Sequence, residues 1–194
     1  MREPTLCLRD ITAIMSTKTH TANTHMDKKV KKSKSWRSQL SYLLKNSQRK
    51  RPTAPTVEEL DQWAESMDKL LGSRYGRIAF HVFMKSEYCE ENLEFWIACE
   101  ELRQIKSSNK LRSKARAIYE EFVKCESPKE VNLDYLTRDA IEQTLSLASP
   151  SPSCFTGAQT KVYSLMENNC YPRFLLSSLY CDLRTSATQR DRRA

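Results

Sequence analysis

The chain has 194 residues, of which 39% are hydrophobic and 9% aromatic, a size that suits one domain with extensions and a real core. Only three glycines argue against a phosphate-binding loop fold or a turn-rich β-sandwich, so an all-α class is predicted. The net charge of +8 is unevenly spread, because residues 1–55 carry +10 and residues 56–194 carry −2. A basic arm on a mildly acidic body favours an anionic partner for the arm, either a membrane surface or nucleic acid.

The chain carries no pattern typical of secretion, membrane spanning or catalysis. Its seven cysteines include no Cys-x-x-Cys pair, and its first residues lack a secretory apolar segment, so we expect free thiols in a reducing compartment. No run reaches the roughly 18 apolar residues of a transmembrane helix. The three histidines indicate no metal cluster or catalytic triad, and there is no Gly-x-x-x-x-Gly-Lys loop. We therefore expect no catalytic residue, no metal and no cofactor.

The basic arm divides into two segments. Residues 1–27, rich in Thr, are predicted to be a disordered tail that carries Cys7. Residues 28–51 contain ten Lys or Arg and no acid, and their apolar residues recur on one helical face. This pattern is typical of an amphipathic helix that lies in a membrane interface. The residues expected to bind the membrane are Lys31, Lys32, Lys34, Trp36, Arg37, Leu40, Leu43 and Leu44.

The partner predicted for this helix is a surface of anionic inner-leaflet lipids. Each basic residue near such a surface contributes on the order of 1 kcal/mol. The same lysines also fit a disordered basic arm or a nuclear-import signal. Nucleic acid is not expected, because one Trp and one Tyr offer little surface for base stacking. We therefore expect a cytoplasmic protein held peripherally at the plasma membrane, with the nucleus as the alternative.

The body of the chain is predicted to be helical. Residues 52–55 contain two prolines and form a linker, after which Thr56 and Glu59 match a capping box. The helix that follows places Trp63 in the core and ends at Gly72. Further helices are expected on about 75–85, on about 90–104, from Leu111 to Val123, and over 136–145 with Leu136 on the buried face. The next helix is expected to begin at a Ser153 cap, to place Leu165 on its buried face and to break at Pro172. A last helix then precedes a flexible tail over 184–194.

The helix over residues 90–104 has apolar residues nearly all round it. One side carries Leu93, Trp96 and Ile97, and the opposite side carries Phe95, Cys99 and Leu102. Such a helix is usually wrapped by other helices, so Cys99 is expected to pack in the core. Its first turn holds Glu90, Glu91 and Asn92, and acids there suit the positive end of the helix dipole. These polar residues are either plain helix-start chemistry or a tip presented to a partner.

The stretch around this helix resembles a known signature. Residues 86–100 read Ser-Glu-Tyr-Cys-Glu-Glu-Asn-Leu-Glu-Phe-Trp-Ile-Ala-Cys-Glu, which resembles the RGS domain of the regulators of G-protein signalling. Further residues of the family pattern recur in order at 129–134, 137–138, 154–155, 158–159 and 165–175, so the resemblance covers about 56–183. It implies a small monomeric protein with an RGS-type bundle of about nine helices, in which an antiparallel four-helix bundle joins a subdomain of the terminal helices.

The resemblance also implies a function. RGS domains accelerate GTP hydrolysis by Gα subunits without donating the chemistry, because Gα already supplies an Arg and a Gln that orients water. They bind the switch segments better when these hold the transition-state shape. The protein is then a GTPase activator that binds GTP-bound Gα, and not itself an enzyme. By position, the residues implied to contact Gα are Tyr88, Cys89, Glu91, Asn92, Asn132, Leu165, Asn169, Cys170 and Arg173.

Taken singly, two of these residues have plainer interpretations. Asn132 also fits a turn or cap residue, and Arg173 also fits a surface ion pair. The contact interpretation depends on the three loops together. The family resemblance further suggests lipid attachment at Cys7 and allows it at Cys99, although burial would oppose it at Cys99.

The sequence departs from the family pattern at several contact positions. Cys89 stands where most members have Ser, and Asn169 stands where most have Asp, as in a member that prefers the Gq class. The resemblance therefore implies a protein that leans towards Gαq and acts less on Gαi. Cys170 stands where Ser is usual, and Leu176 stands where that member has an acid. These two differences weaken the transfer of the Gq preference to this chain. The alternative is a scaffold that binds Gα or effectors without accelerating hydrolysis.

Overall fold

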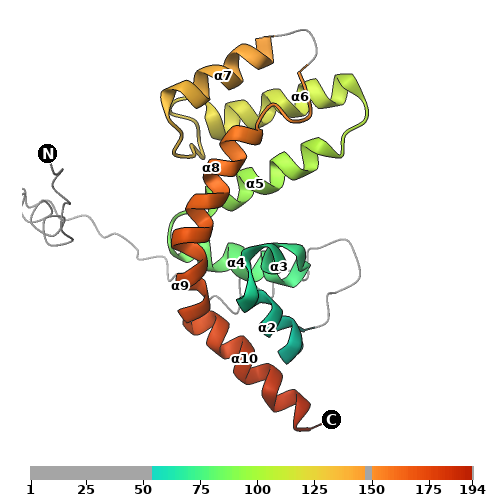
Figure 1. The fold of residues 1–194 in the computed structure, drawn as a ribbon, viewed down its shortest axis with the longest axis vertical. Helices are drawn as coiled ribbons and strands as arrows, with labels where there is room; N and C mark the ends of the chain where they lie inside the picture. The colour runs from blue at the N-terminus through green and yellow to red at the C-terminus, as the bar shows by residue number, and fades with distance from the viewer. Residues whose placement is uncertain (1–53, 147–149, 194) are drawn as a thin grey trace, which may run out of the picture. The chain divides into compact units, whose positions relative to one another are not determined.

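The computed structural model describes residues 54–146 and 150–193, and every regular element in these ranges is a helix (Figure 1), which confirms the all-α prediction. No helix of this part is long and apolar enough to cross a bilayer, and the same residues hold no group of three or more metal-binding side chains. The elements are α2 Val57–Glu65, α3 Met67–Gly72, α4 Arg74–Ser86, α5 Glu90–Arg103, α6 Ser108–Ile118, the π-helical turn η1 Tyr119–Val123, α7 Tyr135–Ser146, α8 Thr156–Leu165, the π-helical turn η2 Met166–Cys170, α9 Tyr171–Leu176 and α10 Ser178–Asp191.

Several predictions fall outside the described residues. They concern the tail over 1–27, the amphipathic helix over 28–51 with its eight membrane-binding residues, and Cys7. These stay predictions.

The start of the domain follows its sequence signals, with one break that they do not reveal. The Thr56 hydroxyl accepts a hydrogen bond from the Glu59 backbone N–H, and the Glu59 carboxylate accepts one from the Thr56 N–H, both at 3.2 Å. The single helix expected up to Gly72 is instead divided at Ser66, whose backbone is extended. The Ser66 hydroxyl accepts from the Lys69 N–H at 3.2 Å, so this residue serves as the N-cap of α3.

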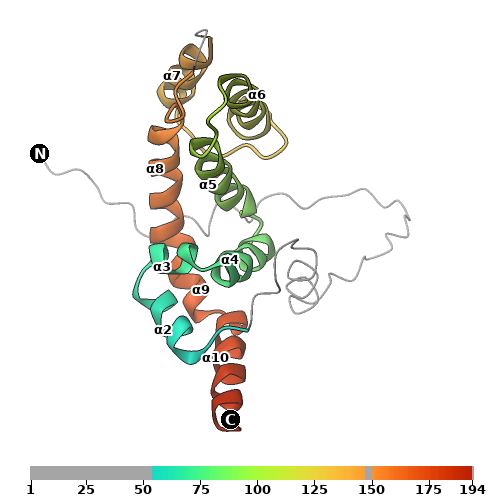
Figure 2. The same cartoon turned by 90° about the vertical axis from the view of Figure 1, so that its right-hand side faces the viewer.

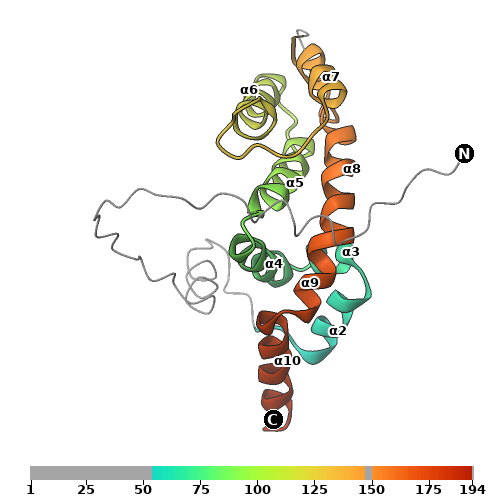
Figure 3. The ribbon, with the colours of Figure 1, turned by 90° about the vertical axis from the view of Figure 1, so that its left-hand side faces the viewer.

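The helices form two connected groups. Helices α5, α6, α7 and α8 pack in a ring, each on the next, and occupy the upper part of Figures 2 and 3. Below them, α2, α3 and α4 pack with α9 and α10. The continuous run α8–η2–α9 passes through both groups, so its residues can face segments from either one.

An aromatic cluster marks the core of the lower group. Phe174 of α9 packs edge-on against Phe80 and Phe83 of α4, with ring centroids 5.3 and 5.7 Å apart, and lies 5.5 Å from Tyr180 of α10. These rings bury large apolar area and add roughly 0.5–1.5 kcal/mol per pair beyond that burial. Because α9 begins directly after η2, this packing also fixes the direction in which the α8–η2–α9 run passes through the domain.

Helix α5 is buried on both of its apolar sides, although not completely. Leu93 on one side and Phe95 and Cys99 on the opposite side are buried, as predicted. Trp96 and Ile97 are only partly buried but pack against the core, so other helices cover α5 on most of its circumference and leave part of one side accessible. The buried Cys99 thiol is 3% exposed, and burial raises its pKa to about 12, so lipid attachment there would require the helix to leave the core.

The C-terminal third differs most from the sequence expectation. Pro172 does not break the chain but lies in the first turn of α9, where a missing N–H removes no helical hydrogen bond. The break comes at Ser177, which is extended and caps α10 by accepting from the Tyr180 N–H at 3.3 Å. The segment over 184–191, predicted to be a flexible tail, continues α10 and buries Ala187.

One predicted cap is also wrong. The Ser153 side chain does not cap α8, because the residue at the cap position is Phe155, which makes no side-chain cap bond. Instead the Ser153 carbonyl accepts from the Thr156 N–H at 3.0 Å in a turn that precedes the helix.

Candidate functional site

Two of the three segments predicted to form the contact site, those before α5 and before α7, lie on one side of the α8–η2–α9 run, and the third segment is part of that run (Figure 1). The segment before α5 is joined to α9 by an ion pair between Glu87 and Arg173, 2.9 Å long. The segment before α7 is joined to α8 by an ion pair between Asp134 and Lys161. Four exposed residues of the run recur at intervals of four and so follow one line along it. They are Lys161, Leu165, Asn169 and Arg173.

The first segment is a tight turn with an exposed aromatic residue. Tyr88 has φ of +58° and is 90% exposed, which is an uncommon backbone conformation for a residue of this size. Cys89 follows at the N-cap of α5 and makes no side-chain cap bond, in agreement with the poor capping expected of Cys. Its thiol lies 3.6 Å from the Met84 carbonyl.

Asn92 is hydrogen-bonded within the first turn of α5. Its side-chain NH₂ donates to the Cys89 carbonyl at 3.1 Å and to the Glu91 carboxylate at 2.7 Å. Its Oδ1 is buried and accepts no hydrogen bond within the described chain. Burial raises the pKa of Glu91, and the charges of Glu90 and Glu94 add to the effect. The first turn of α5 therefore concentrates negative charge at its surface and holds an unpaired acceptor beneath it.

The second segment holds Asn132 in an irregular stretch before α7. Asn132 is exposed between the buried Val131 and Leu133, and its side chain makes no hydrogen bond within the described residues. The cap of α7 is Asp134, whose carboxylate accepts from the Thr137 N–H at 2.9 Å. Asn132 is therefore not the cap residue of the plainer interpretation, and its amide is left free to bind a partner.

Charged side chains hold the stretch around Asn132 against α5 and η1. Lys129 forms ion pairs with Glu94 of α5 at 2.8 Å and with Glu121 of η1 at 2.7 Å. Arg138 donates to the Leu133 carbonyl at 3.2 Å and pairs with Glu130 at 2.8 Å. These contacts fix the backbone on both sides of Asn132.

The third segment combines exposed and buried positions. Leu165 is 39% exposed, so its predicted place on the buried face of α8 is wrong, and its predicted place in the contact site is accessible. The Asn169 side chain is exposed and donates to the Leu165 carbonyl at 3.1 Å, and its side-chain oxygen accepts no hydrogen bond from another described residue. Cys170 and Asn92 are each 5% exposed, so these two support the face from beneath rather than offering surface to a partner.

A comparison with protein families identifies the family of the domain that carries this face. Residues 66–183 match the model of the Regulator of G protein signaling domain. The chain belongs to the RGS family.

Curated relatives agree with this assignment. The chain is 50% identical over 135 residues to regulator of G-protein signaling 8 of Homo sapiens, covering 70% of this chain and 74% of that protein. It is 50% identical over 129 residues to regulator of G-protein signaling 5 of Rattus norvegicus, covering 66% and 70%. With the type 5 protein of Sus scrofa it shares 49% over 126 residues, covering 65% and 68%. Membership of the RGS family implies that the chain binds Gα subunits.

The RGS domain also exposes apolar residues that sequence reasoning missed. Tyr135 and Leu136, at the start of α7, are both 76% exposed, and Leu176 at the end of α9 is 84% exposed. Leu136 was expected on the buried face of its helix. It lies in the first turn of α7, and helical periodicity cannot reveal how far a neighbouring helix covers that turn. The first two residues extend the accessible surface beside Asn132.

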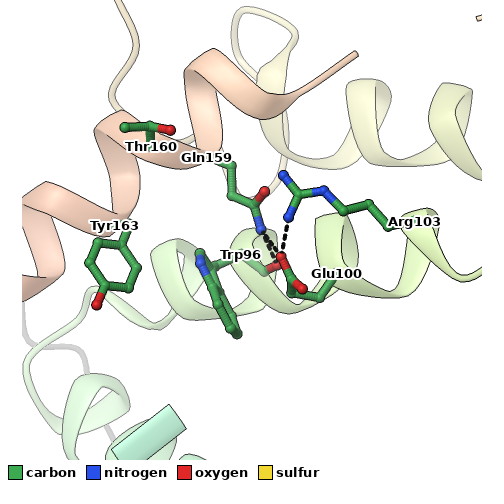
Figure 4. A pocket seen from close by; sticks show the side chains of 6 residues that line it. All are labelled: Trp96, Glu100, Arg103, Gln159, Thr160 and Tyr163. Carbon is green, nitrogen blue, oxygen red and sulfur yellow. Dashed lines mark hydrogen bonds and ion pairs between the residues drawn. The ribbon is translucent and has the colours of Figure 1, made fainter. Parts of the chain in front are cut away.

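A polar cavity of about 210 Å³ lies between α5 and α8 (Figure 4). Gln159 donates to the Trp96 carbonyl at 3.2 Å and to the Glu100 carboxylate at 2.7 Å, and Arg103 pairs with the same carboxylate. Small-molecule sites are usually larger, roughly 300–1,000 Å³, and keep polar groups free for the ligand. Here the polar groups bind one another, so these contacts join α5 to α8 and the cavity is a poor ligand site.

Proposed function

We propose that this protein accelerates GTP hydrolysis by the α subunits of heterotrimeric G proteins and so attenuates receptor signalling. The observation that carries the proposal is the position of Asn132. Its amide is exposed, makes no hydrogen bond to another described residue, and lies in a stretch held by ion pairs of Lys129 and Asp134, beside a line of exposed residues from α8 to α9. An Asn amide donates and accepts at once, so one side chain can bind a Gα glutamine and a switch backbone together.

The proposed mechanism requires no catalytic group on this chain. Gα supplies the Arg and the Gln of the hydrolytic reaction, and the partner has only to hold the switch segments in their transition-state arrangement. Acceleration then equals the ratio of the affinities for the transition state and for the ground state. A hundredfold acceleration corresponds to about 2.7 kcal/mol. Two or three hydrogen bonds from a rigid face, each contributing about 1 kcal/mol, are sufficient.

We further propose a leaning towards the Gq class. Cys89 removes the side-chain cap that Ser would give α5, and Asn169 removes the negative charge that Asp would place one turn before Arg173. Both changes lie on the contact face and alter its charge or its local geometry. Replacing Cys89 by Ser and Asn169 by Asp together is expected to raise stimulation of Gαi.

We also propose that the basic segment over 28–51 holds the protein at anionic inner-leaflet lipids. Ten basic residues without an acid, combined with Trp36 on an apolar face, support this placement. Binding to vesicles that contain an anionic phospholipid is expected to weaken on Trp36→Ala. Steep salt-dependent binding to duplex DNA, unchanged by Trp36→Ala, would instead favour nucleic acid.

The decisive experiment is single-turnover GTP hydrolysis with the full chain. A Gαi preparation and a hydrolysis-competent Gαq preparation are each assayed with the unmodified protein, with Asn132→Ala and with the control Asn109→Ala. Asn109 is exposed in the first turn of α6, away from the contact face. Acceleration lost with Asn132→Ala and kept with Asn109→Ala supports the proposal.

The other outcomes separate its parts. Equal acceleration of both Gα classes would retain the GTPase activator and remove the selectivity assigned to Cys89 and Asn169. Binding to Gα without acceleration would place the protein in the scaffold class.

A further inference from the structure

Two cysteines of the contact face touch each other across the join between its first and third segments. The Sγ atoms of Cys89 and Cys170 lie 3.9 Å apart, although 81 residues separate them in the sequence. Cys89 is half-buried at the N-cap of α5, and Cys170 is the last residue of η2. The Glu87–Arg173 ion pair joins the same two segments, so the two thiols meet at an established contact.

The Cys89 thiol is held by one hydrogen bond besides its contact with Cys170, among the described residues. It makes no cap bond to α5 but donates to the Met84 carbonyl at 3.6 Å, and this bond breaks when Cys89 reacts. A disulfide has an S–S length of about 2.05 Å, so the two sulfur atoms must approach by roughly 2 Å. The tight turn at Tyr88 precedes Cys89 directly and can absorb part of this movement, since it lies outside both helices.

We propose that Cys89 and Cys170 form a thiol–disulfide site, oxidised by a low-molecular-weight disulfide such as glutathione disulfide. The Cys89 thiolate attacks one sulfur of glutathione disulfide, which breaks its S–S bond and releases one glutathione thiolate. The Cys170 thiolate then attacks the Cys89 sulfur of the mixed disulfide and releases the second glutathione. The protein loses two electrons and two protons, and one glutathione disulfide becomes two molecules of glutathione.

The consequence of oxidation rests on the proposed function. Drawing the sulfur atoms together moves the first turn of α5 relative to η2, and with it Glu91 and Asn92 relative to Asn169. A misplacement of about 1 Å can cost a hundredfold in rate where a reaction depends on positioning. We expect oxidation to lower the stimulation of Gα GTP hydrolysis by tenfold or more, and a dithiol reductant to restore it.

Burial and the neighbouring charges set the rate at which glutathione disulfide oxidises Cys89. Burial raises the pKa of the Cys89 thiol to about 12, and the neighbouring Cys170 and the Glu91 carboxylate act in the same direction, while Arg173 opposes them. Because the thiolate is the attacking form, oxidation is slow near pH 7 and its rate rises about tenfold per pH unit between roughly pH 7 and 9.

The experiment uses the full chain and glutathione disulfide at about pH 8.5. Excess reagent is removed, free thiols are alkylated, and peptides from non-reducing digestion are weighed by mass spectrometry. We expect a cross-linked peptide pair that contains Cys89 and Cys170. Part of the same sample, freed of oxidant before alkylation and before contact with Gα, is assayed for single-turnover GTP hydrolysis with and without reductant.

Two cysteine variants test whether this pair is responsible, each compared only with its own reduced form. Cys170→Ala removes one partner, and Cys181→Ala removes an exposed thiol on α10. The tenfold loss on oxidation should persist in Cys181→Ala and vanish in Cys170→Ala. Persistence of the loss in Cys170→Ala would overturn the assignment.

The remaining outcomes distinguish this inference from the proposed function. Absence of the Cys89–Cys170 peptide while Cys125 and Cys181 carry glutathione would refute the thiol–disulfide site and leave GTPase activation standing. A cross-link without loss of stimulation would refute the regulatory effect. A reduced protein that fails to accelerate any Gα would contradict the proposed function, while the cross-linked peptide still decides the chemistry of the pair.

Discussion

A methyl group added at Gly76 tests how closely α3 and α4 pack. Gly76 lies in the first turn of α4, and its N–H donates to the Ser73 hydroxyl at 3.2 Å. A Cβ atom at this position would lie 2.3 Å from the Leu70 carbonyl oxygen and 3.0 Å from Leu70 Cδ1. The side-chain atom can move aside, but the carbonyl oxygen belongs to the backbone of α3. In Gly76→Ala the two helices must therefore separate.

The magnitude follows from two opposing effects. Overpacking that shifts backbone costs about 1–3 kcal/mol, and a clash with backbone belongs at the upper end. Replacing Gly by Ala inside a helix returns about 1 kcal/mol through helix propensity. We expect a net loss of about 2 kcal/mol in the free energy of unfolding for Gly76→Ala. In a chain of this size that loss lowers Tm by about 4–8 °C.

The assay is urea denaturation of the full chain, followed by circular dichroism, with Gly157→Ala as the matched control. Gly157 also lies in the first turn of a helix, but a Cβ there would meet no atom within 4 Å. The control should gain up to about 1 kcal/mol, since only the propensity effect remains. If Gly76→Ala proves as stable as the control, the close approach of α3 to α4 does not hold in solution.

Two further predictions concern the clamp around Asn132. Lys129→Met removes two ion pairs of a half-exposed side chain and a contact with an aromatic ring at 5.7 Å. We expect urea denaturation to show a loss of about 1 kcal/mol in the free energy of unfolding, and GTPase stimulation to fall. If neither value changes, these contacts do not hold the segment around Asn132. The Lys161 ammonium and the Thr137 N–H hold the pKa of Asp134 below its usual range, so this carboxylate stabilises the fold above about pH 4 and loses that contribution as the pH falls further. The stability gap between the unmodified protein and Asp134→Asn should be widest near pH 7 and narrow from about pH 4 downwards, whereas a gap independent of pH would show that the charge has no role.

Local signals predicted the features that depend on local chemistry. The capping box at Thr56 and Glu59 and the end of α3 at Gly72 both appear where the sequence predicts them. Apolar periodicity likewise identified Leu93 and Phe95 as core residues of α5. Such features are encoded within a few neighbouring residues, so the sequence alone suffices to find them.

Burial could not be predicted where it depends on a distant helix. Trp96, Leu136 and Leu165 are apolar residues at helical spacing, yet each is half-buried or exposed. Periodicity shows that a face is apolar but not how far the neighbouring helix extends over it. The same limit applies to Ser66, since Ser is found both inside helices and at caps, and only the packing of Trp63 and Leu70 on either side of it decides between the two.

The contact site depends most on whether the helical run continues past Pro172. A helix that ended there would separate Arg173 from Leu165 and Asn169, and the third contact segment would not form one line. The chain avoids the break because η2 precedes α9, with the Tyr171 N–H bonded to the Met166 carbonyl five residues earlier. The proline then falls where no donor is needed, the run continues to Leu176, and Arg173 reaches Glu87 of the first segment. A π-helical turn has no recognised sequence signal, yet here it keeps Leu165, Asn169 and Arg173 of the third contact segment on one continuous helical run.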